Sequence, residues 1–315
     1  SAMDEFEIIR RFFTSDSASD SVVVGVGDDG AVLRPAPGKD LVSVIDTMVA
    51  GVHFPDTLPS ADIGFRAVAI NISDIAAMAA VPRWMTMALT LDEAQPDWLD
   101  GFAKGVRDAS RQYGVELVGG DITRGSDKVI SVQVTGEVDP GSVLTRSGAQ
   151  SGDGIYVSGT PGDAALGLSI IESGAPAGDA VDYLVRRFSR PDARVALGSA
   201  LAGRASAAID LSDGLYADLV KLLDASGVAG RIRLDDLPAS TELAGMVSRE
   251  DALAFMLGGG DDYELAFTSA DESIIRLAGD VAVTRIGSVV EGEGLSCTLD
   301  GEPYKFDGQG YRHFH

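Results

Sequence analysis

The chain has 315 residues, 45% of them hydrophobic, which is long and apolar enough for two folded domains. Its formal net charge of −23 disfavours binding to nucleic acid and to anionic membranes, because both attract clustered lysine and arginine. No apolar run approaches the roughly 20 residues that a membrane-spanning helix needs, and the single cysteine, Cys297, excludes an internal disulfide and favours the cytoplasm.

Helical and strand patterns alternate through the first part of the chain. They predict a helix over 4–13, a strand, turn and strand over 22–32, a strand over 41–47, a helical stretch over 61–80, a strand over 83–91, a helix over 95–113, and strands over 115–118 and 129–138. Ser73 and Asp74 are typical helix N-caps, so we expect them to interrupt the stretch 61–80 and to start a second piece at Ile75.

A segment rich in Gly, Ser and Pro, 139–153, marks a domain boundary, and we predict domains at 1–142 and 150–315. The second part has strand patterns at 155–158, 207–210 and 263–268 and helical patterns over most of 162–203 and over 215–225. It ends in a run of short strands. These patterns on both sides of the boundary are compatible with two α/β units.

Carboxylates between glycines recur along the chain. Asp28 and Asp29 follow Gly27 and precede Gly30, and Gly-Gly-Asp occurs again at 119–121 and 259–261. Adjacent like charges are costly unless a cation neutralises them. The acids that lie beside small residues at expected strand ends or helix starts are Asp29, Asp46, Asp74, Asp121, Asp210 and Asp213. An all-oxygen set of this kind is typical of Mg²⁺ sites that share their ligands with substrate phosphates.

Other site chemistries fit the sequence less well. Gly25, Gly27 and Gly30 match the dinucleotide-binding spacing, but prolines follow within a few residues where that motif needs a helix, and the intervening acids would repel phosphate. No Gly-Lys-Ser/Thr loop is present, and three histidines and one cysteine without ligand spacing do not build a zinc site.

A structural interpretation of the same residues stays open. Each acid could cap local backbone amides, and the excess of acids could serve only to keep the surface soluble. His53 could be an ordinary loop histidine, Arg146 a surface charge or a phosphate clamp, and Tyr311 a packing aromatic.

Seven motifs in this order resemble one family. They are Gly-Asp-Asp-x-Ala (27–31), Asp-Thr-x-Val-x-Gly-Val-His-Phe (46–54), Asn-x-Ser-Asp-x-Ala-Ala-Met (71–78), Gly-Gly-Asp-x-Thr (119–123), Thr-Arg-x-Gly-Ala (145–149), Ile-Asp-x-Ser-Asp-Gly-Leu (209–215) and Gly-Gly-Asp-Asp-Tyr-Glu-Leu (259–265). Together they resemble the thiamine-monophosphate kinases, which are related to aminoimidazole-ribotide synthetase and selenophosphate synthetase.

The resemblance implies transfer of the ATP γ-phosphoryl group to thiamine monophosphate with several Mg²⁺ ions. It implies the fold class α/β (α+β, with mixed sheets) in a two-domain, ribotide-synthetase-like architecture. It also implies a homodimer formed through the sheet of the N-terminal domain. By position, the six acids above would hold the metals, while Tyr113, Gly120, Asp121, Arg146 and Ser212 would contact ATP, and His53, Asp261 and Tyr311 would contact the thiamine substrate. The acceptor phosphate is already ionised, so no residue is expected to act as a general base.

Two alternatives remain at this stage. One is another ATP-dependent synthetase of the same superfamily, of the aminoimidazole-ribotide type. The other is a non-catalytic, acidic cation-binding protein.

Overall fold

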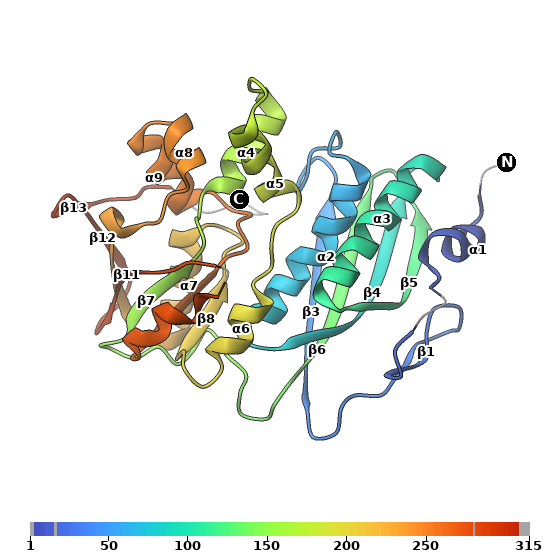
Figure 1. Cartoon of the computed structure of the whole chain (residues 1–315), viewed down its shortest axis with the longest axis horizontal. Helices are drawn as coiled ribbons and strands as arrows, with labels where there is room; N and C mark the ends of the chain where they lie inside the picture. The colour runs from blue at the N-terminus through green and yellow to red at the C-terminus, as the bar shows by residue number, and fades with distance from the viewer. Residues whose placement is uncertain (1–2, 16–17, 280, 309–315) are drawn as a thin grey trace. The chain divides into compact units, whose positions relative to one another are not determined.

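The structure is a computed structural model that describes residues 3–15, 18–279 and 281–308. The chain forms two compact units, one of Ser1–Ile75 with Ala80–Gly141 and one of Ala76–Ala79 with Ser142–His315. Each unit combines helices with a sheet of mixed strand direction (Figure 1), so the predicted fold class is confirmed. In the part of the chain that is described, none of the helices has the length and hydropathy to cross a bilayer.

The first unit is built on a four-stranded sheet. Its strands are β3 (Asp40–Val49), β6 (Val129–Val138), β4 (Val81–Leu91) and β5 (Glu116–Arg124), in that order across the sheet. Helices α2 (Ser60–Ala77) and α3 (Pro96–Tyr113) lie over one face of this sheet (Figure 1). A short helix α1 (Glu5–Ile8), a π-helical turn η1 (Ile9–Phe13) and the antiparallel pair β1 (Val22–Val24) and β2 (Val32–Leu33) complete the unit.

Glycines let α2 and α3 approach each other closely. A β-carbon on Gly105 of α3 would lie 1.8 Å from the carbonyl oxygen of Ala61, and one on Gly64 of α2 would lie 2.2 Å from that of Phe102. The predicted ends of α3 are confirmed. Pro96 stands at its start, and Gly114 ends it in the left-handed conformation, with φ 65°, donating its N–H to the carbonyl of Ser110.

Two local predictions for the first unit are wrong. Helix α2 runs without interruption through Ser73 and Asp74, because neighbouring apolar residues bury this stretch and tertiary packing outweighs the capping preference. Asn71 is fully buried, and its side-chain Nδ2 donates a hydrogen bond to the carbonyl of Ala67 at 3.0 Å. Strand β5 does not end at Val118 but continues through Gly120, whose missing side chain lets it lie beside Met87 of β4.

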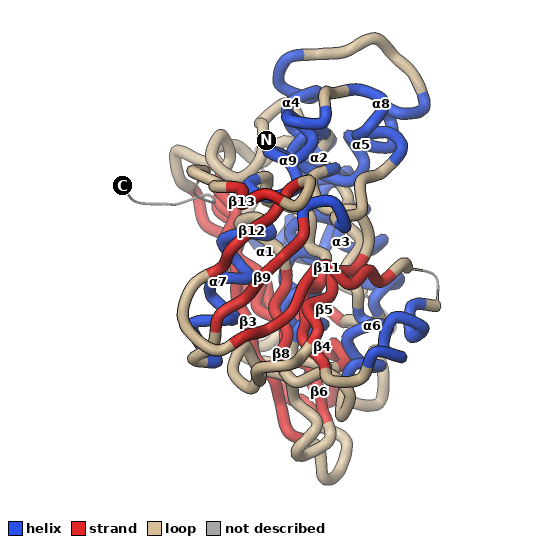
Figure 2. Tube along the Cα trace, turned by 90° about the vertical axis from the view of Figure 1, so that its left-hand side faces the viewer, coloured by secondary structure: helices blue, strands red, loops and turns tan. Residues whose placement is uncertain are grey.

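The second unit is built on a seven-stranded sheet. Its strands, in order across the sheet, are β13 (Glu302–Tyr304), β12 (Leu295–Leu299), β9 (Ala229–Arg233), β11 (Val283–Val290), β7 (Gly154–Ser158), β10 (Leu265–Ser269) and β8 (Ala207–Asp210). Figure 2 shows β12, β9 and β11 side by side. Its helices are α4 (Asp163–Ser173), α5 (Asp179–Ser189), α6 (Val195–Leu201), α7 (Leu215–Ser226), α8 (Thr241–Met246) and α9 (Arg249–Gly258), with short 3₁₀ turns η2 (Leu234–Asp236) and η3 (Glu272–Ala278).

Helix α7 is anchored by leucines. Leu215, Leu219, Leu222 and Leu223 are completely buried in one apolar cluster, which also contains Ile209 of β8. Their 3.6-residue spacing is what the sequence pattern predicts for an amphipathic helix. This packing fixes the turn between β8 and α7, which carries Ser212 and Asp213.

Replacing Gly105 with alanine is expected to destabilise the first unit, although the intrinsic helix propensity of alanine is better than that of glycine by about 1 kcal/mol. The two helices must separate to admit the methyl group, at a cost of about 1–3 kcal/mol. Thermal unfolding followed by circular dichroism would show a melting temperature lower by several degrees. Gly245→Ala is the matched control, because nothing lies within 4 Å of a β-carbon at that position in α8. Equal melting temperatures for Gly105→Ala and the unchanged chain would contradict this packing.

Candidate functional site

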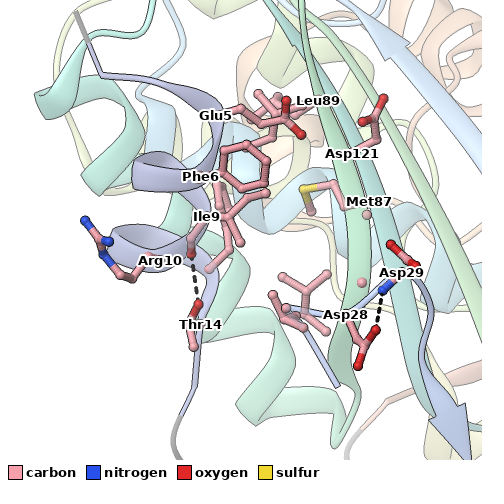
Figure 3. Close-up of a pocket in the computed structure, with 17 residues that line it drawn as sticks. Glu5, Phe6, Ile9, Arg10, Thr14, Asp28, Asp29, Met87, Leu89 and Asp121 are labelled. Atoms are coloured by element: carbon pink, nitrogen blue, oxygen red, sulfur yellow. Dashed lines mark hydrogen bonds between the residues drawn. The ribbon is translucent and has the colours of Figure 1, made fainter. Parts of the chain in front are cut away.

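A pocket of about 620 Å³ lies in the first unit, between the N-terminal helical segment and strands β4 and β5 (Figure 3). One part of its lining is apolar, with Phe6, Ile9, Phe13, Val26, Met87, Leu89, Leu117 and Ile122. Another part is acidic, with Glu5, Asp28, Asp29 and Asp121. A cavity with an apolar wall and a few convergent polar groups is the usual form of a small-molecule site.

The turn that carries Asp28 and Asp29 is shaped by a glycine. Gly27 has φ +116°, a conformation that side chains disfavour, and the N–H of Asp29 donates to the carboxylate of Asp28 at 2.8 Å. Both acids are exposed. Figure 3 shows them on the side of the pocket opposite Ile9, so their oxygens are accessible to a ligand in it.

Strand β5 brings Asp121 to the same pocket. A β-carbon on Gly120 would lie 2.0 Å from the carbonyl oxygen of Met87, so only glycine lets β5 pair with β4 here. Asp121 is exposed and accepts a hydrogen bond from the hydroxyl of Thr123 at 3.1 Å. Asp29, Gly120 and Asp121, three of the predicted site residues, therefore line one cavity although they are far apart in the sequence.

The other predicted residues of the first unit lie outside this lining. Asp46 is inside β3, opposite Val132, and not at the end of a strand as its sequence context suggested. Asp74 belongs to α2, and Tyr113 at the end of α3 packs its ring 6.1 Å from that of Phe65. His53 lies in the turn after β3, where its Nδ1 accepts the N–H of Val49 at 2.9 Å.

In the second unit, two segments place four predicted residues side by side. Asp210 ends β8 and is opposite Leu265 of β10, and Ser212 and Asp213 follow in the turn to α7. The N–H of Asp261 donates to the carbonyl of Ser212 at 2.9 Å, which joins the Gly-Gly-Asp-Asp segment to that turn. Asp261 has φ 69°, a left-handed conformation that costs a non-glycine residue free energy, and strained residues of this kind cluster at functional sites.

The last two predicted residues come from other segments of the chain. Arg146 is exposed in the segment after the first unit, and its carbonyl accepts from the hydroxyl of Ser226 at 2.8 Å. Tyr311 falls outside the described residues.

A buried carboxylate that the sequence reasoning missed holds the turn before α7. Asp218 is 1% exposed, and its Oδ2 accepts the N–H groups of Ser212, Asp213 and Gly214 at 3.0, 3.0 and 3.2 Å. Burial raises the pKa of Asp218, while the nearby Lys221 opposes the shift. An acid in the first turn of a predicted helix is a capping signal, and it could have pointed to this residue.

Glu264, directly after the strained segment, is held by two arginines. Arg194 donates to both of its oxygens, from Nε at 2.8 Å and from Nη2 at 2.6 Å, and Arg187 donates from Nη2 at 3.0 Å. Burial alone would raise the pKa of Glu264, but the hydrogen bonds and charges of Arg194 and Arg187 bring it below its ordinary value. Glu264 is therefore an ionised, fully buried anchor for the end of this segment.

Asp262 anchors the middle of the same segment to α4. Its carboxylate accepts the N–H of Gly162 at 2.8 Å and that of Ala164 at 3.2 Å, at the start of the helix. Burial raises the pKa of Asp262 to about 8. Asp262, and not the neighbouring Asp261, therefore stabilises the start of α4.

The six predicted metal ligands do not form one cluster within either unit. Asp29, Asp46, Asp74 and Asp121 belong to the first unit, and Asp210 and Asp213 to the second. Over the described residues, no group of three or more histidine, cysteine, aspartate or glutamate side chains is placed to hold a metal ion. The exposed carboxylates of Asp29 and Asp121 still fit Mg²⁺, which keeps several waters and needs only one or two protein ligands.

Comparison with known proteins gives matches over nearly the whole chain. Residues 27–138 match the N-terminal domain model of AIR synthase related proteins, and residues 150–300 match the C-terminal one. Thiamine-monophosphate kinase of Escherichia coli (strain K12) is 43% identical over 324 residues, covering 99% of each chain. The enzyme of that name from Bacillus subtilis (strain 168) is 34% identical over 329 residues, covering 99% of this chain and 100% of the relative.

Solved structures agree with these matches. The crystal structure of thiamine-monophosphate kinase from Stenotrophomonas maltophilia K279a superposes with a TM-score of 0.85 at 42% identity, covering 90% of this chain and 93% of that one. A second structure, AaThiL complexed with AMPPCP and TMP, gives a TM-score of 0.80 at 33% identity, covering 94% of this chain and 93% of the other.

The raised pKa of Asp262 makes the stability of the second unit depend on pH. Its pKa is about 4 in the unfolded chain and about 8 in the fold, so the folded state binds more protons between these values. The free energy of unfolding should therefore fall as pH rises through this window, by up to about 1.4 kcal/mol per pH unit. Urea unfolding of the Asp262→Asn variant at a series of pH values should show a smaller slope.

Asp224→Asn is the matched control for this measurement, because Asp224 is an exposed acid of α7 in the same unit. It should keep the slope of the unchanged chain. The same slope in Asp262→Asn would contradict the assignment of the pH dependence to Asp262.

Proposed function

The chain belongs to the thiamine-monophosphate kinase family, and we propose on this basis that it transfers the γ-phosphoryl group of ATP to thiamine monophosphate, forming thiamine diphosphate. The observation that carries this conclusion is 43% identity to the Escherichia coli kinase over 99% of both chains. The complex of a relative with AMPPCP and TMP supports the same two substrates.

The pocket of the first unit suits a nucleotide. A purine base is apolar on its faces and would lie against Phe6 and Ile9, and the phosphates would reach the acidic part of the lining. Phe6 is 77% exposed, which is unusual for a phenylalanine and leaves its ring available for stacking. We assign the base to this apolar wall.

The acids beside the phosphates are assigned to Mg²⁺, which would neutralise the two polyanionic substrates and bring them together. Asp29 and Asp121 would hold metal in the first unit, and Asp210 and Asp213 in the second. Asp46 and Asp74 stay predicted ligands by family resemblance. No general base is assigned, because the attacking phosphate oxygen is already ionised at neutral pH.

The remaining contacts are assigned by family resemblance. Gly120, Ser212, Arg146 and Tyr113 would contact ATP, and His53, Asp261 and Tyr311 the thiamine substrate. The place of Gly120 in the lining of the pocket supports its role, and the absence of a side chain there lets β5 pair closely with β4. The strained backbone of Asp261 supports its assignment as a substrate contact.

A homodimer through the sheet of the first unit is proposed as well. Leu41 and Ile45 of β3 are 52% and 66% exposed, and they alternate with core-facing residues along the strand. Two exposed apolar side chains on one face of this edge strand are compatible with an interface there. Sedimentation equilibrium of the full chain tests this assembly.

A cytoplasmic location stays a prediction.

The direct test of the proposed function is an assay of ADP and thiamine diphosphate formation with ATP, thiamine monophosphate and excess Mg²⁺. We expect the two products in equal amounts. ADP without thiamine diphosphate, or turnover only with a ribotide substrate, would contradict the proposal.

Asp121→Asn is expected to lower kcat at least about 100-fold, because it removes one charge from the site that neutralises the phosphates. The melting temperature should stay within a few degrees, since Asp121 is exposed and its recorded hydrogen bond is to Thr123. Asp127→Asn is the control, an exposed acid beyond the end of β5 that does not line the pocket. Loss of folding with loss of activity would favour a structural role instead.

Phe6→Ala is expected to raise the KM for ATP about 2- to 10-fold, because it removes the stacking surface for the base. The KM for thiamine monophosphate should change little. Ile275→Ala removes a 43% exposed apolar side chain of the second unit and should alter neither value. An unchanged KM for ATP in Phe6→Ala would place the base elsewhere.

A further inference from the structure

The ammonium group of Lys221 lies against a carboxylate that is assigned to metal. Its Nζ makes a short contact with Oδ2 of Asp213 and donates to Oδ1 of Asp218 at 2.9 Å. The side chains of Lys221 and Asp213 are 41% and 30% exposed, so both remain in reach of solvent ions. Asp213 therefore has a cationic partner supplied by the protein itself.

The position of this lysine is fixed by the buried acid beneath it. Asp218 uses one oxygen for the three N–H groups of residues 212–214 and the other for Lys221. Lys221 follows Asp218 by three residues in α7, so both project from the same side of the helix. The same carboxylate thus shapes the turn that carries Asp213 and holds the cation beside it.

A carboxylate oxygen in contact with an ammonium group is not freely available to a second cation. Mg²⁺ must either displace Lys221 from that oxygen or bind with a positive charge only a few ångströms away. Both routes weaken metal binding to Asp213 when no nucleotide is present.

We propose that Lys221 is an internal counter-ion that competes with Mg²⁺ for Asp213 and keeps the affinity of this carboxylate for free metal low. The inference rests on the proposed role of Asp213 as a metal ligand. It makes Lys221 a positioning residue, which acts on the reaction through the state of Asp213.

The test is calorimetric titration of the full chain with Mg²⁺ alone, without nucleotide. Lys221→Met and Lys221→Gln both remove the charge, and glutamine keeps a donor for Asp218, so at least one variant should preserve the turn. Both are expected to bind Mg²⁺ at least about threefold more tightly than the unchanged chain. Lys221→Arg keeps the charge and should stay close to the unchanged chain.

Lys104→Met is the matched control. Lys104 forms an i,i+4 pair with Asp108 in α3, at 3.0 Å, so this variant removes one positive charge beside an acid that is not assigned to metal. It should leave the affinity for Mg²⁺ unchanged. Tightening of the same size in Lys104→Met would show a general charge effect and overturn the inference.

Asp213→Asn separates the inference from the assignment on which it rests. If Lys221→Met tightens Mg²⁺ binding in the unchanged chain but not in the Asp213→Asn background, the competition is confirmed. If Asp213→Asn alone weakens Mg²⁺ binding but Lys221→Met does not tighten it, the competition is overturned and the metal assignment survives. If Asp213→Asn changes Mg²⁺ binding in neither background, the metal assignment of Asp213 is wrong, and the inference fails with it.

Discussion

The cost of bringing like charges together governs both parts of this chain. In the second unit, protein cations meet the carboxylates, with Arg187 and Arg194 on Glu264 and Lys221 on Asp213 and Asp218. In the first unit, Asp29 and Asp121 face a cavity as exposed carboxylates. The buried acids Glu264 and Asp218, neutralised by protein cations, serve as anchors, while acids that are open to solvent can take a divalent cation.

The buried acids Asp262 and Glu264 hold the glycine-rich segment before β10 in one conformation. The Gly-Gly-Asp-Asp-Tyr segment (259–263) contains two non-glycine residues with positive φ, Asp261 and Tyr263, and such backbone persists only where its surroundings hold it. Glu264 holds its end through Arg194, and Asp262 ties it to the start of α4. The backbone bond from Asp261 to Ser212 then connects it with the turn that Asp218 shapes.

The sequence predicts most of this fold, because periodicity and terminating residues are local signals. Helix α3 has the predicted ends, set by Pro96 and Gly114. The errors arise where packing decides, as in the unbroken α2 and in β5, which passes through Gly120 because a neighbouring carbonyl leaves no room for a side chain. The sequence places Asp29 and Asp121 in one set of candidate magnesium ligands, but only the fold shows that both line the same cavity. The roles of Glu264 and Asp262 depend on contacts with residues far away in the chain, which a single sequence does not reveal.

The cavity of the first unit is proposed to bind the nucleotide, with its base on the apolar wall and its phosphates and metal at the acids. A crystal structure of the chain with a non-hydrolysable ATP analogue and Mg²⁺ tests this most directly. We expect the base to lie against Phe6 and Ile9, and a metal ion to lie within about 2.1 Å of an oxygen of Asp29 or Asp121. A nucleotide bound away from this cavity, with neither carboxylate near a metal ion, would contradict it.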